Sequence, residues 1–282
     1  MTRSLRTHDG IELSVDVVTG SAPSGTIWLS HATGFNGACW NPVIERLRED
    51  AATIVVIDHR GHGRSQRVPI PISWWDMGND VRWIVDRVDG PAPHIGVGHS
   101  MGGAAITMAE VTRPGTFGAM VLVEPILLGD PIRRTDYPLA EVVRKRRRQF
   151  VSREKARSNF GRKTPFSRWD PKAIDGYVAS GLRDEDGSLV LSCLPEFEAE
   201  VYDAAHAHGA FRLLRHLRPP TVVMMGEEAD TFGLDWAGEI VRAMSDAELA
   251  VVAGGDHFIP MSHPTLVARE IRRALRRPVS PA

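Results

Sequence analysis

Gly96-Val97-Gly98-His99-Ser100-Met101-Gly102-Gly103 is the stretch of sequence that decides the fold. A short apolar run precedes it, and the small residues that follow are typical of a closely packed helix. The spacing Gly98-x-Ser100-x-Gly102 is that of a nucleophile elbow, a tight turn between a buried strand and a helix. In such a turn the serine hydroxyl stands clear of the sheet, and a Cβ atom on either glycine would collide with its neighbours. Ser100 is therefore the candidate nucleophile, at a helix N-terminus where free N–H groups can stabilise a developing anion.

The composition of the 282-residue chain fits one large domain, or one domain with an inserted subdomain. The net charge of -1 predicts no nucleic-acid partner, and no apolar run is long enough to span a membrane. Cys39 and Cys193 form no metal or redox motif, so we expect two buried thiols and a reducing, cytoplasmic location. The polar residues 1–14 predict no signal peptide. We expect a small-molecule substrate, and a homodimer is the assembly that we consider.

Strands and helices are expected to alternate along most of the chain. Polar and apolar residues alternate over residues 4–18, which predicts an antiparallel hairpin. Later runs of apolar and β-branched residues predict buried parallel strands with helices between them. The expected strands are 26–30, 53–57, 91–97, 118–123, 221–225 and 248–252, and the expected helices are 40–50, 75–88, 103–110, 234–244 and 264–273. This order predicts an α/β fold with helices on both faces of the sheet.

The alternation stops in residues 127–217, which are charged, helical in pattern and without a clear buried strand. We therefore expect one α/β core, residues 1–126 and 218–282, interrupted by a helical insertion. Arg144-Lys145-Arg146-Arg147-Arg148 lies in this insertion. The run could attract an anionic substrate, or it could be a solvated helix face balanced by nearby acidic residues. We favour the solvated face.

Four motifs resemble those of the α/β-hydrolase superfamily in type and in order. They are His31-Ala32-Thr33-Gly34-Phe35, Asp58-His59-Arg60-Gly61-His62-Gly63-Arg64-Ser65, Gly98-His99-Ser100-Met101-Gly102 and Gly255-Asp256-His257-Phe258. The resemblance covers essentially the whole chain, although the insertion resembles the helical caps of the superfamily only in position and length. It implies a mostly parallel eight-stranded sheet with helices on both faces and a cap over the active site.

The resemblance also implies the partners of the nucleophile. His257 lies on a glycine-rich loop after the last expected strand, where the superfamily has its catalytic histidine, and imidazole can accept and return a proton near neutral pH. The oxyanion hole would consist of two backbone N–H groups. One belongs to Met101, which follows the nucleophile. The other is assigned to Thr33, with Phe35 as the alternative.

The acid of the triad is open between two positions. In the commoner pattern the acid follows the strand after the cap, but that slot holds Ala229, and Asp230 is displaced by one residue. The other position used in the superfamily lies at the end of the strand 118–123, and it holds Glu124. A carboxylate that ends an apolar strand needs a partner, and His257 is available. We favour Glu124, with Asp230 as the alternative and Glu228 after it.

These residues predict a cofactor-independent serine hydrolase that cleaves an ester, thioester or lactone through an acyl-enzyme. C–C bond hydrolysis of a ketone or diketone, or acyl transfer, on the same residues is the alternative. A non-catalytic ligand-binding protein of this fold is a third hypothesis. The sequence shows neither a metal-ligand cluster nor a dinucleotide-binding glycine pattern. Several aromatic residues could line an apolar pocket under the cap or form ordinary packing contacts: Trp74, Trp75, Trp169, Phe150, Phe160 and Phe166.

Overall fold

A computed structural model describes residues 1–277 except 22, 51, 130–138 and 232, and its central feature is a single large sheet. Eight strands follow one another in the order β1-β2-β4-β3-β5-β6-β10-β11. β1–β2 and β2–β4 are antiparallel pairs, and the other pairs are parallel. The strands are β1 (Thr2–Arg6), β2 (Glu12–Thr19), β3 (Thr26–Ser30), β4 (Thr53–Ile57), β5 (His94–His99), β6 (Ala119–Val123), β10 (Thr221–Gly226) and β11 (Ala247–Val252). The predicted mostly parallel sheet is confirmed.

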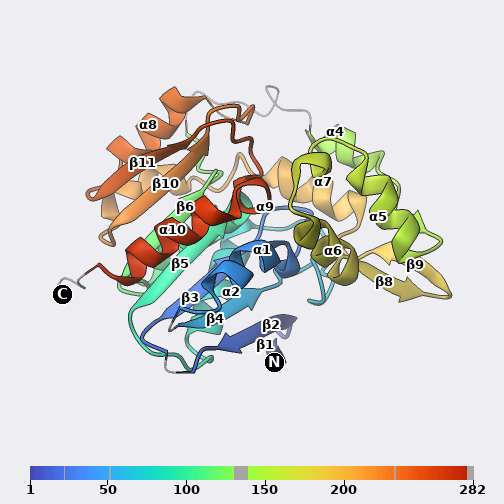
Figure 1. Ribbon diagram of the computed structural model, residues 1–282, viewed down its shortest axis with the longest axis horizontal. Helices are drawn as coiled ribbons and strands as arrows, with labels where there is room; N and C mark the ends of the chain where they lie inside the picture. Colours follow the sequence, from blue (N-terminus) through green and yellow to red (C-terminus); the bar gives the residue numbers. More distant parts are fainter. Residues whose placement is uncertain (22, 51, 130–138, 232, 278–282) are drawn as a thin grey trace.

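Helices cover both faces of this sheet (Figure 1), because successive side chains of each central strand point in opposite directions. Ile27 and Leu29 of β3 belong to a buried cluster with α1 and α10, whereas Trp28 between them belongs to a cluster with α2, α3 and α8. All three side chains are fully buried. The helices are α1 (Asn41–Leu47), α2 (Trp74–Val85), α3 (Met101–Thr112), α8 (Leu234–Arg242), α9 (Ile259–Ser262) and α10 (Pro264–Leu275).

Residues 139–217, here called the cap, lie between β6 and β10 in the sequence and extend to one side of the sheet (Figure 1). The cap contains helices, as expected, but also a small separate antiparallel sheet in the order β7-β9-β8, which the expectation of a helical insertion without a clear buried strand did not include. The turn between β8 and β9 is formed by Asp186 and Gly187, which both have positive φ. Asp-Gly is a strong hairpin signal that the sequence analysis did not use. The cap elements are α4 (Leu139–Arg144), β7 (Gln149–Phe150), α5 (Arg153–Gly161), η3 (Phe166–Arg168), α6 (Pro171–Ser180), β8 (Leu182–Glu185), β9 (Ser188–Leu191), α7 (Pro195–Ala204) and η4 (Ala210–His216).

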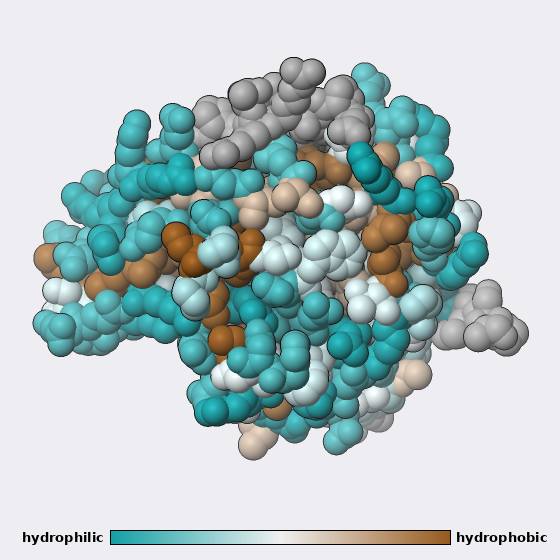
Figure 2. Space-filling model, turned by 180° about the vertical axis from the view of Figure 1, so that it is seen from behind, coloured by the Kyte–Doolittle hydropathy of each residue, from teal (hydrophilic) through white to brown (hydrophobic). Residues whose placement is uncertain are grey.

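The surface is mostly hydrophilic on the face shown in Figure 2, with apolar residues in small separate groups. Val142 and Val151 of the cap are among the exposed large apolar side chains. Within the described ranges, the helices are all too short or too polar to cross a membrane.

Candidate active site

Ser100 occupies a strained turn between β5 and α3. Its φ of 55° and ψ of -117° lie outside the regions that most residues adopt, and its N–H donates to the carbonyl of Val123 at 2.9 Å. A Cβ atom on Gly98 would collide with the backbone of Gly102, and one on Gly102 would collide with the carbonyl of Ser30. Glycine at both positions therefore allows helix, strand and turn to approach closely enough to present the Ser100 side chain at the carboxyl edge of the sheet.

Ser100 lines a pocket of about 280 Å³ between the sheet and the cap. The core contributes Ala32, Thr33, Phe35, Trp74, Ser100, Ile126, Asp230, Thr231, His257 and Phe258, the segment after β6 contributes Leu128, and the cap contributes Leu139, Tyr202, Ala205 and His206. Most of these side chains are apolar. Of the aromatic candidates from the sequence, Trp74 lines the pocket, whereas Trp169, Phe150 and Phe160 pack in a buried cluster of the cap.

Glu124 and His257 meet at the edge of this pocket. Glu124 follows the last residue of β6 and is 1% exposed, and its Oε2 lies 3.2 Å from Nδ1 of His257. Its other oxygen, Oε1, accepts a hydrogen bond from the N–H of Gly226 at 2.6 Å. The two donors offset the cost of burying the carboxylate. A hydrogen bond from Nδ1 to Glu124 leaves Nε2 of His257 as the basic nitrogen.

Asp230 lies at the rim of the same pocket, on the turn that follows β10. It is exposed, in contrast to Glu124. Glu228, two residues earlier and also exposed, forms an ion pair with Arg168 of the cap at 2.9 Å. The structure therefore brings Glu124 to the imidazole of His257.

The loop after β3, residues 31–36, places backbone groups beside Ser100; we call it the β3 loop. Thr33 lines the pocket, and Gly34 has a φ of 78° that favours glycine. The N–H of Phe35 donates to the carbonyl of Ala32 at 3.2 Å, which closes a turn around Thr33. Met101, which follows Ser100, is the first residue of α3, where backbone N–H groups have no partner within the helix.

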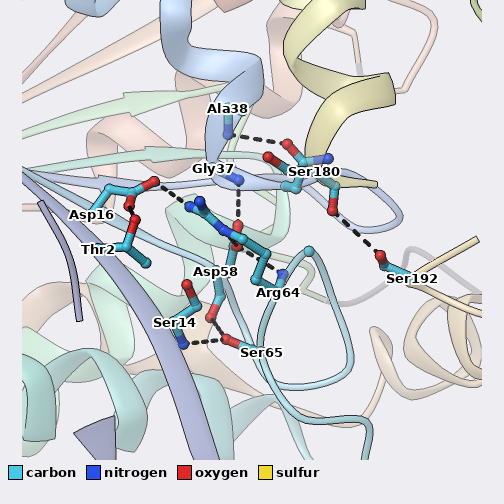
Figure 3. A network of polar contacts seen from close by, with 12 residues as sticks. Thr2, Ser14, Asp16, Gly37, Ala38, Asp58, Arg64, Ser65, Ser180 and Ser192 are labelled. Atoms are coloured by element: carbon cyan, nitrogen blue, oxygen red, sulfur yellow. Dashed lines mark hydrogen bonds and ion pairs between the residues drawn. The ribbon is translucent and has the colours of Figure 1, made fainter. Parts of the chain in front are cut away.

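Asp58 connects the β3 loop with the loop after β4. Its Oδ1 accepts a hydrogen bond from the N–H of Gly37 at 2.7 Å, and its Oδ2 accepts one from the N–H of Arg64 at 2.9 Å (Figure 3). Burial raises the pKa of Asp58, and these donors oppose that shift. Gly37 begins the helix η1 (Gly37–Trp40), so Asp58 fixes the end of the β3 loop. Its place in the sequence motif after the fourth strand is the signal that could have indicated this role.

Buried histidines surround the site, and their pKa values suit structural roles. Nδ1 of His31 donates to the carbonyl of Ala32 at 2.8 Å, and Nε2 accepts from the N–H of His59 at 3.0 Å. Burial lowers the pKa of His31 to about 4 and that of His62 to about 3, so both rings are neutral near pH 7. Nε2 of His99 donates to the carbonyl of His257 at 2.8 Å, which fixes the backbone that carries His257.

Comparison with known proteins connects this geometry with a family. A family model described as "Alpha/beta hydrolase family" matches residues 29–270. The chain belongs to this family. Monoglyceride lipase of Homo sapiens is 31% identical over 119 residues, which are 41% of this chain and 39% of the lipase. An abhydrolase domain-containing protein of Alternaria alternata, ACTT2, is 33% identical over 99 residues, 35% of this chain and 37% of the fungal protein. The chain thus matches less than half the length of these relatives.

Solved structures share the whole fold. A peroxisomal alpha-beta-hydrolase from Saccharomyces cerevisiae superimposes with a TM-score of 0.82 over 99% of this chain and 86% of the yeast protein. The two sequences are 20% identical, so this likeness shows the α/β-hydrolase fold alone.

Proposed function

We propose that the protein is a serine hydrolase in which Ser100, His257 and Glu124 form the catalytic triad. In the first step Nε2 of His257 accepts the hydroxyl proton as Oγ of Ser100 attacks the carbonyl carbon of the substrate. The tetrahedral intermediate collapses to an acyl-enzyme, and the leaving group departs with the proton from His257. Water, activated by the same imidazole, then releases the acid. The contact between Nδ1 of His257 and Glu124 carries the proposal, because it orients the imidazole and stabilises its charged form.

Two backbone N–H groups would stabilise the oxyanion, those of Met101 and Thr33. Met101 supplies an N–H at the positive end of α3. The hydrogen bond between Phe35 and Ala32 occupies the N–H of Phe35, which supports Thr33 as the second donor. Thr33 also lines the pocket together with Ser100 and His257.

We propose an ester, thioester or lactone with an uncharged apolar acyl group as the substrate. The pocket lining supports an apolar group, and the human relative is a monoglyceride lipase by name. In this proposal residues 1–126 and 218–282 form the catalytic core and residues 127–217 form the inserted domain. Of this insertion, residues 130–138 lie outside the described residues, and residues 139–217 are the part called the cap above. The free, buried Cys39 and Cys193 suit the reducing conditions of a cytoplasm.

Active-site labelling tests the function before any substrate is known. A fluorophosphonate should label the protein on Ser100, and a panel of chromogenic esters, thioesters and lactones should then identify the scissile bond. Ser100→Ala should abolish labelling and lower kcat by about 10⁶, as loss of the nucleophile does in a serine protease. An unlabelled wild-type protein would favour a ligand-binding role. Turnover of diketones in preference to esters would favour C–C bond hydrolysis.

A further inference from the structure

We propose that Arg146, Glu198 and Tyr177 of the cap form a positioning network for the β3 loop and thereby for the second oxyanion donor. The inference rests on the function proposed above, since it concerns the hole that the reaction would use. None of the three residues lines the pocket between the sheet and the cap. They would therefore act through the backbone of the loop.

Glu198, on α7, is in direct contact with the β3 loop. A Cβ atom on Gly34 would collide with Oε1 and Cδ of Glu198, so the carboxylate occupies the space beside this glycine. The Glu198 side chain is 4% exposed. Gly34 follows Thr33, and the peptide group that joins them is part of the turn that would present the oxyanion donor. If the Glu198 carboxylate moved away, the β3 loop would lose its packing contact at Gly34.

Tyr177, on α6, contacts the next two residues of the same loop. Its ring lies 5.4 Å from the ring of Phe35, and its carbonyl accepts a hydrogen bond from Nδ2 of Asn36 at 3.1 Å. Two cap helices thus contact three consecutive loop residues, 34 to 36. Arg146 joins the two helices, because Nη1 donates to Oε2 of Glu198 and Nη2 donates to the Tyr177 hydroxyl at 2.7 Å.

The electrostatics make Arg146 necessary for this arrangement. Burial raises the pKa of the Glu198 carboxyl group, and the Arg146 guanidinium opposes that shift. Without the guanidinium, the carboxylate would be a buried charge without this partner and would have to move or take up a proton. Buried ion pairs contribute little stability compared with apolar residues of similar volume. A role in positioning explains better than stability why an ion pair occupies this place.

The arginines of the basic run, residues 144–148, thus differ in burial and in the environment of their partners. Arg144, two residues earlier, pairs with Asp203 of the same helix α7 at 2.6 Å, but its side chain is 45% exposed. Arg146 is 22% exposed, and its carboxylate partner is buried against the β3 loop. The expectation that the run forms a solvated helix face was therefore wrong for Arg146. Arg144 provides the matched control, since it also ties its segment of the cap to α7.

The test compares transition-state and ground-state binding in Arg146→Met, Glu198→Gln and Tyr177→Phe. A trifluoromethyl ketone with an apolar chain would form a tetrahedral adduct with Ser100 and report on the oxyanion hole, whereas KM for a chromogenic ester reports on the pocket. We expect Arg146→Met and Glu198→Gln to lower kcat and the affinity for the ketone in parallel, each by about 10- to 100-fold, because a slightly misplaced donor stabilises the oxyanion poorly. KM should change by no more than about twofold, as should every parameter of Arg144→Met.

Two further variants separate positioning from folding. The double variant Arg146→Met/Glu198→Met replaces the ion pair by apolar side chains, so it should fold even if a single variant does not. It should still show the low kcat. Tyr177→Phe removes one hydrogen bond and should lower kcat by about threefold to tenfold with the same signature.

The outcomes distinguish the two proposals. If the wild-type protein forms the ketone adduct and the folded variants keep their kcat, the positioning network is wrong and the triad stands. A loss of kcat without a parallel loss of ketone affinity would also overturn the network. If the wild-type protein neither reacts with a fluorophosphonate nor binds the ketone, the proposed function fails, and the network fails with it.

Discussion

The core and the cap contribute two unlike walls to the pocket. On the core side, Ser100 and Glu124 each lie directly after a strand, and hydrogen bonds to the backbone of neighbouring strands fix both residues. On the cap side, Leu139 begins α4 and Ala205 follows α7, and both contribute apolar surface. The difference suggests a division of labour. Groups at strand ends cannot shift without breaking the sheet, which suits chemistry. The cap side chains that line the pocket, in contrast to the network of Arg146, Glu198 and Tyr177, can differ without disturbing the sheet, which suits substrate selection.

The largest effect that this division predicts, after loss of the nucleophile itself, is that of Glu124→Gln. The amide keeps the size of the side chain but supplies no negative charge to stabilise the His257 imidazolium. The comparable change in a serine protease lowers kcat by about 10⁴, and we expect a loss of about 10³ to 10⁴ with little change in KM. Steady-state kinetics on the best ester of the panel would measure it.

Asp230→Asn is the matched control for this prediction, because Asp230 lines the same pocket but lies on an exposed turn. We expect it to lower kcat by at most about tenfold, through disturbance of the turn. If Asp230→Asn were the more damaging variant, the turn would have to bring Asp230 to the imidazole during the reaction, and the assignment of Glu124 would be wrong.

The sequence predicted the core wall far better than the cap wall, and the reason is physical. The glycines around Ser100 are required by close backbone contacts, so their spacing indicated Ser100. The strand before Glu124 is a continuous apolar run, and the resemblance to the superfamily indicated its end as one of the positions for the acid. Gly226, whose N–H binds Glu124, was missed because a backbone donor leaves no mark on its own side chain.

The cap has no comparable pattern. Arg144 and Arg146 look alike in the sequence, and only the fold makes one exposed and the other a partner of buried Glu198. The β8–β9 hairpin was missed because its strands carry mixed polar and apolar residues, although Asp186-Gly187 marked its turn. The burial and the partner of a charged side chain depend on the tertiary fold, so the local sequence does not reveal them.

The next prediction concerns the pH dependence of the stability of the core rather than turnover. Two histidines of the core are fully buried. Burial lowers the pKa of His31 from 6.5 to about 4 and the pKa of His62 to about 3. Between pH 6.5 and about 4 the unfolded chain binds protons that the folded chain does not, so the free energy of unfolding must fall as the pH falls. For His31 alone the loss would be on the order of 3 kcal/mol.

Denaturant unfolding between pH 7.5 and about 4 would measure this effect. His62→Gln removes one titrating ring, so the unfolding free energy should depend less steeply on pH. His216, an exposed residue of η4, supplies the control, and His216→Gln should leave the slope unchanged. A stability that stays flat down to about pH 4 would show that the buried rings can be protonated in the folded state.

The smallest effect concerns the cap wall. It tests whether the cap side chains that line the pocket select substrates without taking part in the reaction. Ala205 is buried and lines the pocket, so the ring of Ala205→Phe should fill part of its volume. We expect kcat/KM for long-chain esters to fall about tenfold relative to acetyl esters, because a hydrophobic pocket discriminates by the methylene groups that it can admit. Ala207→Phe adds the same ring at an exposed position two residues away and should leave this ratio unchanged.

A different result would contradict this role of the cap. If Ala205→Phe lowered kcat equally for every ester, and if fluorophosphonate labelling slowed by the same factor, the cap wall would participate in the reaction at Ser100. The selectivity ratio is therefore the decisive quantity, since only a filled pocket changes it while leaving the attack on a short acyl group intact.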